Sequence, residues 1–300
     1  MSTRGKIIII IGFIILFIIG MSIYIKSMFM YSLKGVDVAE NSVLEIPLVG
    51  ELSDRSGDFN PMWESFPGPS LNGIRKSLKI AAKDDRIQSV LLIPNFLSGT
   101  GFGKLNELGE ILTEFKESSG KKIYAHIEAC GAKEYYLATF CDSIFAVPTG
   151  IMMANGLQGS VYYLKEGMDK IGINADFIAI GKYKNAPEMF TRKSISDDQK
   201  EVLNNLLDHY YEDYLQTISQ NRKLPKERVK TILDIGFFSS EQAFKLGLVD
   251  KVCYKQDIFE KLKAANGKIK KIDYVNYGRQ DLESFYASST EKIAVVYAQG

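Results

Sequence analysis

Short apolar runs alternate with amphipathic helices along most of this 300-residue chain, and that alternation limits the folds open to it. Ser89–Ile93 is a continuous apolar run, which is typical of a strand buried on both faces of a parallel sheet. Such alternation favours right-handed crossovers and an α/β fold with one layered core. The expected strands are 42–49, 89–93, 122–127, 143–147 and 175–180, and the expected helices are 71–82, 104–117, 132–140, 161–171, 197–219, 226–233 and 240–246.

The composition excludes several classes of protein. The 37 Lys and Arg residues balance 36 Asp and Glu residues, and a nucleic-acid binder needs a basic excess, so no nucleic-acid partner is expected. Three Cys and two His residues exclude a disulfide scaffold and most metal sites, so neither a metal nor a cofactor is expected. The chain has no Gly-x-Gly-x-x-Gly after its first strand and no Gly-x-Ser-x-Gly, which excludes a dinucleotide site and an α/β-hydrolase site.

The N-terminus carries an uncharged apolar run, Ile7–Ile25. A helix of that length spans about 28 Å, close to the thickness of the hydrocarbon core of a bilayer. No small-x-small cleavage site follows, which favours a retained membrane anchor at 1–26 over a cleaved signal peptide. Side-chain charges balance on the two sides of the run, and the α-amino group favours a cytoplasmic N-terminus. We expect a linker at 27–41 and a body at 42–290 outside the cytoplasm.

The two ends of the body resemble each other. Val43–Gly50 and Ile293–Gly300 are both β-type runs that end in Gly, at an offset of 250 residues. One interpretation is that residues 291–300 are the first strand of a second, truncated copy of the domain. The alternative is a C-terminal strand that completes the first sheet.

Phe177–Phe190 is the stretch with the most chemical content. An apolar run reaches Gly181, which permits close backbone approach, and period-two alternation then places Lys182 and Lys184 on one face. A lysine at the end of a buried strand loses hydration, which lowers its pKa and makes it a usable base. The alternative is that both lysines end a strand in solvent.

The run from Gly181 to Phe190 resembles the G-x-Y-K-S-A-x-E-x-F signature of the signal peptide peptidase A family of serine peptidases. The runs Tyr135–Ile144 and Ser239–Asp250 resemble further motifs of that family, in the same order, and the resemblance covers roughly the whole chain. It implies a ClpP/crotonase-like fold of repeated β-β-α units, two fused homologous halves in the long form, and a Ser–Lys dyad.

Residue by residue, the resemblance implies that Lys184 is the general base. Gly181, Tyr183 and Glu188 match the signature, whereas Asn185 replaces its usual Ser. The nucleophilic serine precedes Gly-Gly-Tyr in the serine-bearing half, and Ala132 stands at that position here, so this half has no nucleophile. The partner serine is expected beyond residue 300, at about residue 382 if the two copies are equally long. The loop Leu97–Gly101 is either an oxyanion-binding nest or an ordinary strand-to-helix loop.

The resemblance therefore predicts the lysine-bearing half of a membrane-anchored serine endopeptidase. Its expected substrates are signal-peptide remnants, its expected place is the bacterial cytoplasmic membrane with the body on the outer side, and its expected partners are the second half and further copies in an oligomer. A crotonase-like acyl-CoA enzyme and a catalytically inactive, membrane-tethered scaffold are the alternatives.

Overall fold

The computed structural model describes residues 37–55 and 68–278, together with positions 12, 15–17, 19–22, 24 and 296. Most of the expected anchor at 1–26, most of the expected linker at 27–41 and nearly all of the expected second-copy strand at 291–300 lie outside the described residues. Among the described helices, none combines the length and the apolar character needed to cross a bilayer.

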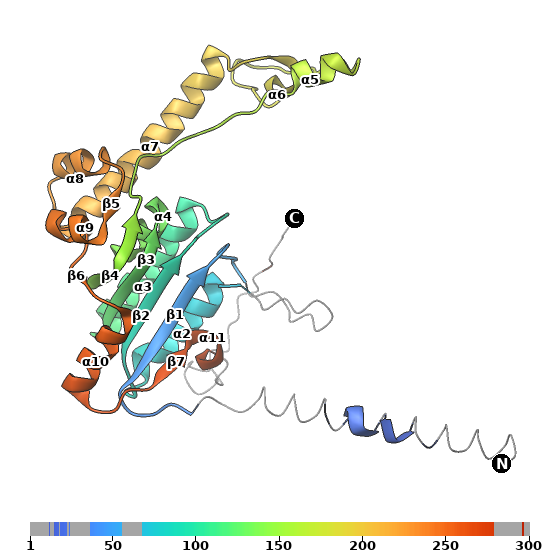
Figure 1. The fold of residues 1–300 in the computed structure, drawn as a ribbon. Helices are drawn as coiled ribbons and strands as arrows, with labels where there is room; N and C mark the ends of the chain where they lie inside the picture. The colour runs from blue at the N-terminus through green and yellow to red at the C-terminus, as the bar shows by residue number, and fades with distance from the viewer. Residues whose placement is uncertain are drawn as a thin grey trace, which may run out of the picture.

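A largely parallel sheet forms the centre of the molecule (Figure 1). The strands lie in the order β5-β4-β3-β2-β1-β7, with β6 also paired to β4, and among the described pairs only β4 with β5 is antiparallel. Four predicted strands are confirmed, and the chain has a mixed α/β fold with a parallel sheet. The strands are β1 (Ser42–Val49), β2 (Ile87–Asn95), β3 (Lys122–Cys130), β4 (Ser143–Met152), β5 (Phe238–Ser239), β6 (Lys251–Val252) and β7 (Lys271–Asp273).

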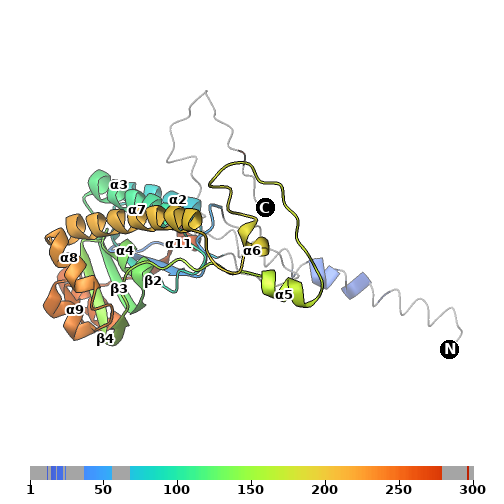
Figure 2. The ribbon, with the colours of Figure 1, turned by 90° about the horizontal axis from the view of Figure 1, so that it is seen from above.

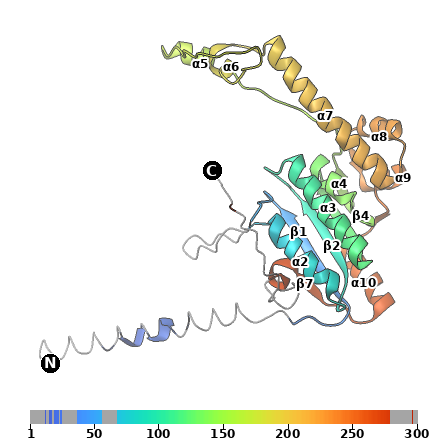
Figure 3. The same ribbon diagram turned by 180° about the vertical axis from the view of Figure 1, so that it is seen from behind.

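Three helices cover one face of this sheet, as Figure 3 shows for α2 and α3. They are α2 (Leu71–Lys83), α3 (Phe102–Ser119) and α4 (Ala132–Ala138). The Ser70 hydroxyl accepts the Gly73 N–H at 3.1 Å and so satisfies one of the unpaired donors at the start of α2. Alternate residues of the strands, such as Ile46 and Leu92, pack with the apolar sides of these helices in the main core.

One helix, α10 (Lys255–Asn266), packs on the opposite face of the sheet. It covers Val43 and Phe145 with Ile258 and Phe259, in a second and smaller apolar cluster. Figure 1 places α10 beside the ends at which β1 to β4 begin. The other ends of these strands, where α4 begins, are therefore not covered by α10.

Residues 156–210, here called the arm, project away from the sheet (Figures 1 and 2). The arm contains α5 (Lys165–Lys170), α6 (Glu188–Thr191) and the first half of α7 (Asp197–Arg222). The second half of α7 returns to the body, where Tyr214, Leu215 and Ile218 are buried. The helix expected at 161–171 is reduced to α5. The helices predicted at 197–219, 226–233 and 240–246 are confirmed as α7, α8 (Lys226–Leu233) and α9 (Ser240–Leu246).

The predicted strand at 175–180 is wrong. Residues 173–180 have no regular structure, and the side chains of Ile178 and Ile180 are 97% and 91% exposed. A strand needs a neighbouring strand to accept and donate its backbone hydrogen bonds. No described strand lies beside this segment, so its apolar residues stay in solvent.

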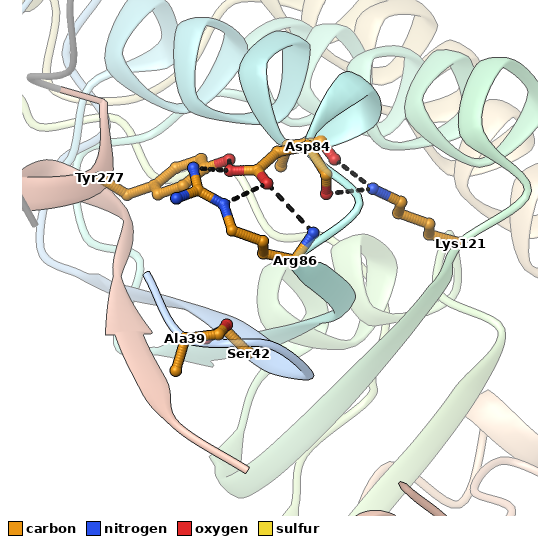
Figure 4. A network of polar contacts seen from close by, with 7 residues as sticks. Ala39, Ser42, Asp84, Arg86, Lys121 and Tyr277 are labelled. Atoms are coloured by element: carbon orange, nitrogen blue, oxygen red, sulfur yellow. Dashed lines mark hydrogen bonds and ion pairs between the residues drawn. The ribbon is translucent and has the colours of Figure 1, made fainter. Parts of the chain in front are cut away.

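A buried carboxylate ties the last described helix, α11 (Tyr274–Tyr277), to the body (Figure 4). Asp84 accepts hydrogen bonds from Arg86 Nε at 2.8 Å, Arg86 Nη2 at 2.9 Å and the Tyr277 hydroxyl at 2.9 Å. Beside it, Lys121 Nζ donates to the carbonyl oxygens of Ala81 and Asp84, both at 2.7 Å. Burial alone would raise the pKa of Asp84, but the hydrogen bonds from Arg86 and Tyr277 outweigh it and hold the pKa below its ordinary value.

Candidate active site

Lys184 lies in a tight turn on the arm, and its side chain is exposed. Its N–H donates to the Gly181 carbonyl at 3.3 Å, and Gly181 has a φ of 107°, which residues with a Cβ rarely adopt. Close backbone approach at Gly181 is not seen, because a Cβ added there would meet no atom within 4 Å. The glycine therefore sets the direction of the turn.

The interpretation that Lys184 ends a buried strand is wrong, since residues 173–180 form no strand and Lys182–Lys184 lie in a turn. Period-two alternation does not apply in a turn, so it does not decide which side chains share a face. The described part of the chain also does not bury Lys184. The described residues therefore do not supply the desolvation that the sequence interpretation expected of this lysine.

Lys182 and Lys184 have different surroundings. Lys182 Nζ lies 3.3 Å from Asp198 Oδ1 and 3.5 Å from Glu201 Oε2, and hydrogen bonds to Tyr183 and Asp198 raise the pKa of Lys182. The Tyr183 hydroxyl donates to Glu201 Oε1 at 3.2 Å and so fixes the turn against α7. Within the described residues the Lys184 amine has neither an ion pair nor a hydrogen bond. Lys182 is held as a cation, whereas Lys184 is available to a partner.

Glu188 connects the turn to the start of α7. Its Oε1 accepts the Ser196 hydroxyl at 2.7 Å, and its Oε2 lies 3.7 Å from Arg192 Nε. Ser196 in turn caps α7 by accepting the Gln199 N–H at 3.1 Å. The Glu188 side chain is only 16% exposed, and its N–H donates to the Asn185 carbonyl at 3.0 Å. Glu188 is thus placed to orient the loop.

Ala132 is the first residue of α4, on the body rather than the arm. Beside it the buried Glu134 accepts the Gly131 N–H at 2.9 Å and the Leu97 N–H at 2.6 Å. Sequence reasoning missed Glu134. A Glu at the third position of a helix is the acidic half of a capping box, here without an N-cap side chain because the N-cap is Gly131, and it was the available signal.

The loop Leu97–Gly101 holds this internal carboxylate. Because Glu134 occupies the Leu97 amide, that amide is not available to a reaction oxyanion. The loop is also fixed to the chain after β1, since the Leu52 N–H donates to Thr100 Oγ1 at 2.9 Å. Of the two sequence interpretations, the geometry favours an ordinary, well-anchored strand-to-helix loop.

The structure does not bring the two predicted positions together. The turn that holds Lys184 lies beside α6, at the far end of α7, whereas Ala132 lies in α4 against the sheet (Figures 1 and 3). No hydrogen bond or ion pair joins Lys184 to α4 among the described residues. The described part of this chain therefore presents a lysine and a serine-less helix start at two separate places.

Residues 115–269 match the family model described as peptidase family S49, and the chain belongs to this family. Within the family it is of the signal peptide peptidase A type, as its curated relatives show.

Two of these relatives illustrate the extent of the similarity. The chloroplastic serine protease SPPA of Arabidopsis thaliana is 33% identical over 88% of this chain and 39% of its own length. Protease 4 of Haemophilus influenzae is 28% identical over 89% of this chain and 47% of its own length. The chain thus spans less than half of these relatives. Among solved structures, a membrane-bound stomatin-specific protease aligns with 78% of this chain and 98% of its own at 10% identity, with a TM-score of 0.46.

Proposed function

We propose that this chain is the lysine-bearing half of a membrane-anchored serine endopeptidase that degrades cleaved signal peptides. One observation carries the proposal: in the turn that matches the family signature, Lys182 is ion-paired and Lys184, at the signature position, is not. The helix start that would hold a nucleophile begins instead with Ala132. The half thus offers a base without a nucleophile.

The chemistry proposed is that of a Ser–Lys dyad. Neutral Lys184 Nζ takes the proton of a serine hydroxyl as the serine oxygen bonds to the scissile carbonyl carbon. The protonated lysine then gives that proton to the leaving amine as the peptide C–N bond breaks, and water hydrolyses the acyl-enzyme in the same way. Because Glu134 occupies the Leu97 amide, oxyanion donors would come from the half that carries the serine.

The remaining parts of the proposal concern the whole protein. A second homologous half beyond residue 300 would supply the serine, at about residue 382, and several copies would form an oligomer. Residues 1–26 would anchor the chain in a bacterial cytoplasmic membrane with the body outside, and the body would have the ClpP/crotonase-like arrangement of repeated β-β-α units. The greater length of the curated relatives supports a second half.

The test is Lys184→Ala in the full natural reading frame, with Lys182→Ala as the matched control. We expect Lys184→Ala to lower hydrolysis of an apolar peptide by at least about 100-fold, the usual contribution of a general base. Lys182→Ala should retain hydrolysis within a few-fold. The Lys182 amine is already ion-paired with Asp198 and Glu201 on α7, so it is not the proposed base. Circular dichroism checks folding, and wild-type turnover by Lys184→Ala would contradict the proposal.

Two further measurements address the alternative functions. The family assignment favours peptide hydrolysis over acyl-CoA chemistry, and thermal stabilisation by CoA thioesters but not by peptides would reverse that order. Failure of a serine-directed fluorophosphonate to label the intact protein would favour the inactive scaffold.

A further inference from the structure

A cavity of about 420 Å³ lies between α10 and the beginnings of β2, β3, β4 and β6. It is on the face of the sheet opposite α4 and away from the arm, so it is separate from the candidate active site. Its volume falls within the range of about 300–1,000 Å³ that is usual for small-ligand sites.

The middle of the cavity is apolar. Tyr124 and Phe145 project from the sheet with their ring centroids 5.8 Å apart, and Ile258 and Leu262 face them from α10. A ligand of this cavity therefore carries apolar side groups.

One side of the cavity, at β2, has polar groups that lack partners. The Ser89 hydroxyl and Gln88 Oε1 are buried, and neither has a hydrogen-bond partner among the described residues. Buried polar groups are nearly always hydrogen-bonded, so these two fit a ligand that brings both a donor and an acceptor. An amide group has both, and a simple aliphatic acid has no N–H.

The other side, at β6, is cationic. Four lysines line the cavity. Lys121 donates to backbone carbonyls and Lys122 pairs with Asp142, whereas Lys251 and Lys261 have neither an ion pair nor a hydrogen bond within the described part of the chain. Asp257 is the carboxylate in the lining, and it accepts the Tyr254 N–H at 2.9 Å. Two unpaired ammonium groups beside one carboxylate leave an excess of positive charge on this side, which suits an anionic group.

The distance between the two sides sets the size of the ligand. β4 and β3 lie between β6 and β2 in the sheet, and three strand spacings amount to about 14 Å. An extended peptide of about four residues covers that distance.

We propose that this cavity binds the C-terminal end of a short apolar peptide. The terminal carboxylate lies beside Lys251 and Lys261, the apolar side chains lie between Tyr124, Phe145 and Leu262, and an amide group meets Gln88 and Ser89. The proposal does not rest on the chemistry of Lys184, because binding is measured without turnover.

Cys253 lines the cavity and gives a local signal for occupancy. Cys253, like Cys130 and Cys141, is buried in the fold, but it is the one of the three that lines this cavity. An uncharged thiol reagent, 4,4′-dithiodipyridine, is added to the full chain, and mass spectrometry separates the adduct at Cys253 from those at the other two cysteines. The probes are acetyl-Leu-Phe-Leu with a free carboxyl group, its C-terminal amide, and octanoate. We expect the free acid to slow labelling of Cys253 at concentrations about tenfold lower than the amide, because it adds charge-assisted contacts.

The matched variants assign the charge. Lys251→Gln with Lys261→Gln should raise the concentration of acid needed for protection about tenfold and leave the amide unchanged. Lys263→Gln, on the same helix but outside the cavity lining, should change neither. Equal protection by acid and amide in the wild-type chain overturns the proposal, as does stronger protection by octanoate than by the peptide acid. This wild-type comparison decides the matter even if the double variant fails to fold.

Discussion

The body and the arm contain apolar residues in similar proportions, yet they use them in opposite ways. In the body, Leu44, Ile46 and Leu48 of β1 are fully buried under helices that follow in the sequence. In the arm, Tyr162, Ile178 and Ile180 are among the most exposed large side chains of the described residues. The body buries its apolar side chains within itself, and the arm does not.

This difference shows which region of the chain buries its apolar surface without a partner. Contiguous exposed apolar surface usually marks an interaction site, and the proposed catalytic lysine lies on the part that carries it. The body buries its apolar side chains within this chain, whereas the arm leaves apolar side chains exposed, which supports the proposal that a partner docks there. Substitutions that compare the two regions test this division directly.

The largest contrast is expected from a matched pair of isoleucines. Ile46→Ala removes methyl groups from a fully buried site and should lower the free energy of unfolding by about 3–4 kcal/mol. Ile178→Ala removes the same atoms from an exposed site and should change it by less than about 0.5 kcal/mol. Urea unfolding of both variants measures the contrast. A large loss of stability for Ile178→Ala would show that the arm is packed within this chain.

A smaller effect on stability is expected at Asp84, the buried carboxylate that ties α11 to the body. Asp84→Ala leaves the buried Tyr277 hydroxyl without an acceptor, which should cost about 2 kcal/mol. Asp85→Ala, at the exposed neighbouring position, is the control and should stay within about 0.5 kcal/mol. Equal losses in the two variants would mean that the contacts of Asp84 do not stabilise the body.

Acid should weaken the body before it changes the arm. The pKa values of Asp84 and Asp250 are held below the ordinary 3.8 by hydrogen bonds that outweigh burial, from Arg86 and Tyr277 to Asp84 and from Arg222 and Ile144 to Asp250. A depressed folded-state pKa stabilises the fold above the unfolded value, and this stabilisation is lost as the pH falls through the folded-state pKa. The urea concentration at the midpoint of unfolding should therefore decrease as the pH is lowered below about 4. Asp84→Asn should make the urea midpoint depend less on pH in this range. An unchanged dependence on pH would be evidence that Asp84 does not couple protonation to stability.

No change in reactivity is expected from the last substitution, Ala132→Ser. Ala132→Ser restores a hydroxyl at the start of α4, but Lys184 is on the arm and Glu134 already holds the Leu97 amide. We expect no labelling of the described half by a fluorophosphonate, in contrast to a serine hydrolase run in parallel. Labelling of Ser introduced at this position would show that the body can activate a nucleophile without the arm.

Local sequence patterns were sufficient to predict the larger elements of the body, but not the short strands β5, β6 and β7 or the helices α10 and α11. The strands β1 to β4 and helices α2 and α3 follow the periods of 2 and 3.6 closely, because their apolar partners lie nearby in the same chain. The segment 175–180 carries the same apolar signal and forms no strand. Its composition does not record whether a neighbouring strand is present, and the structure describes none beside it.

The candidate site was predicted unevenly for a similar reason. The positions of Lys184 and Glu188 follow from a short contiguous signature, and the structure adds that Glu188 contacts Ser196 eight residues away. The pairing of Glu134 with Leu97 joins positions 37 residues apart and was not predicted. The split between an ion-paired Lys182 and an unpaired Lys184 depends on the start of α7, which a strand interpretation does not bring into contact.

The geometry of α7 has a mechanical consequence. The helix is fixed in the body by the buried side chains of Tyr214, Leu215 and Ile218, and from Tyr214 back to Asp197 it extends about 26 Å as a lever. A tilt of about 5° at the fulcrum moves the far end by about 2 Å, whereas catalytic groups need placement within about 0.5 Å. For the proposed proton transfer at Lys184, the body alone is too distant a support. Under that proposal, a contact that holds the far end of α7 is required before Lys184 can act, so assembly with a partner would switch the enzyme on.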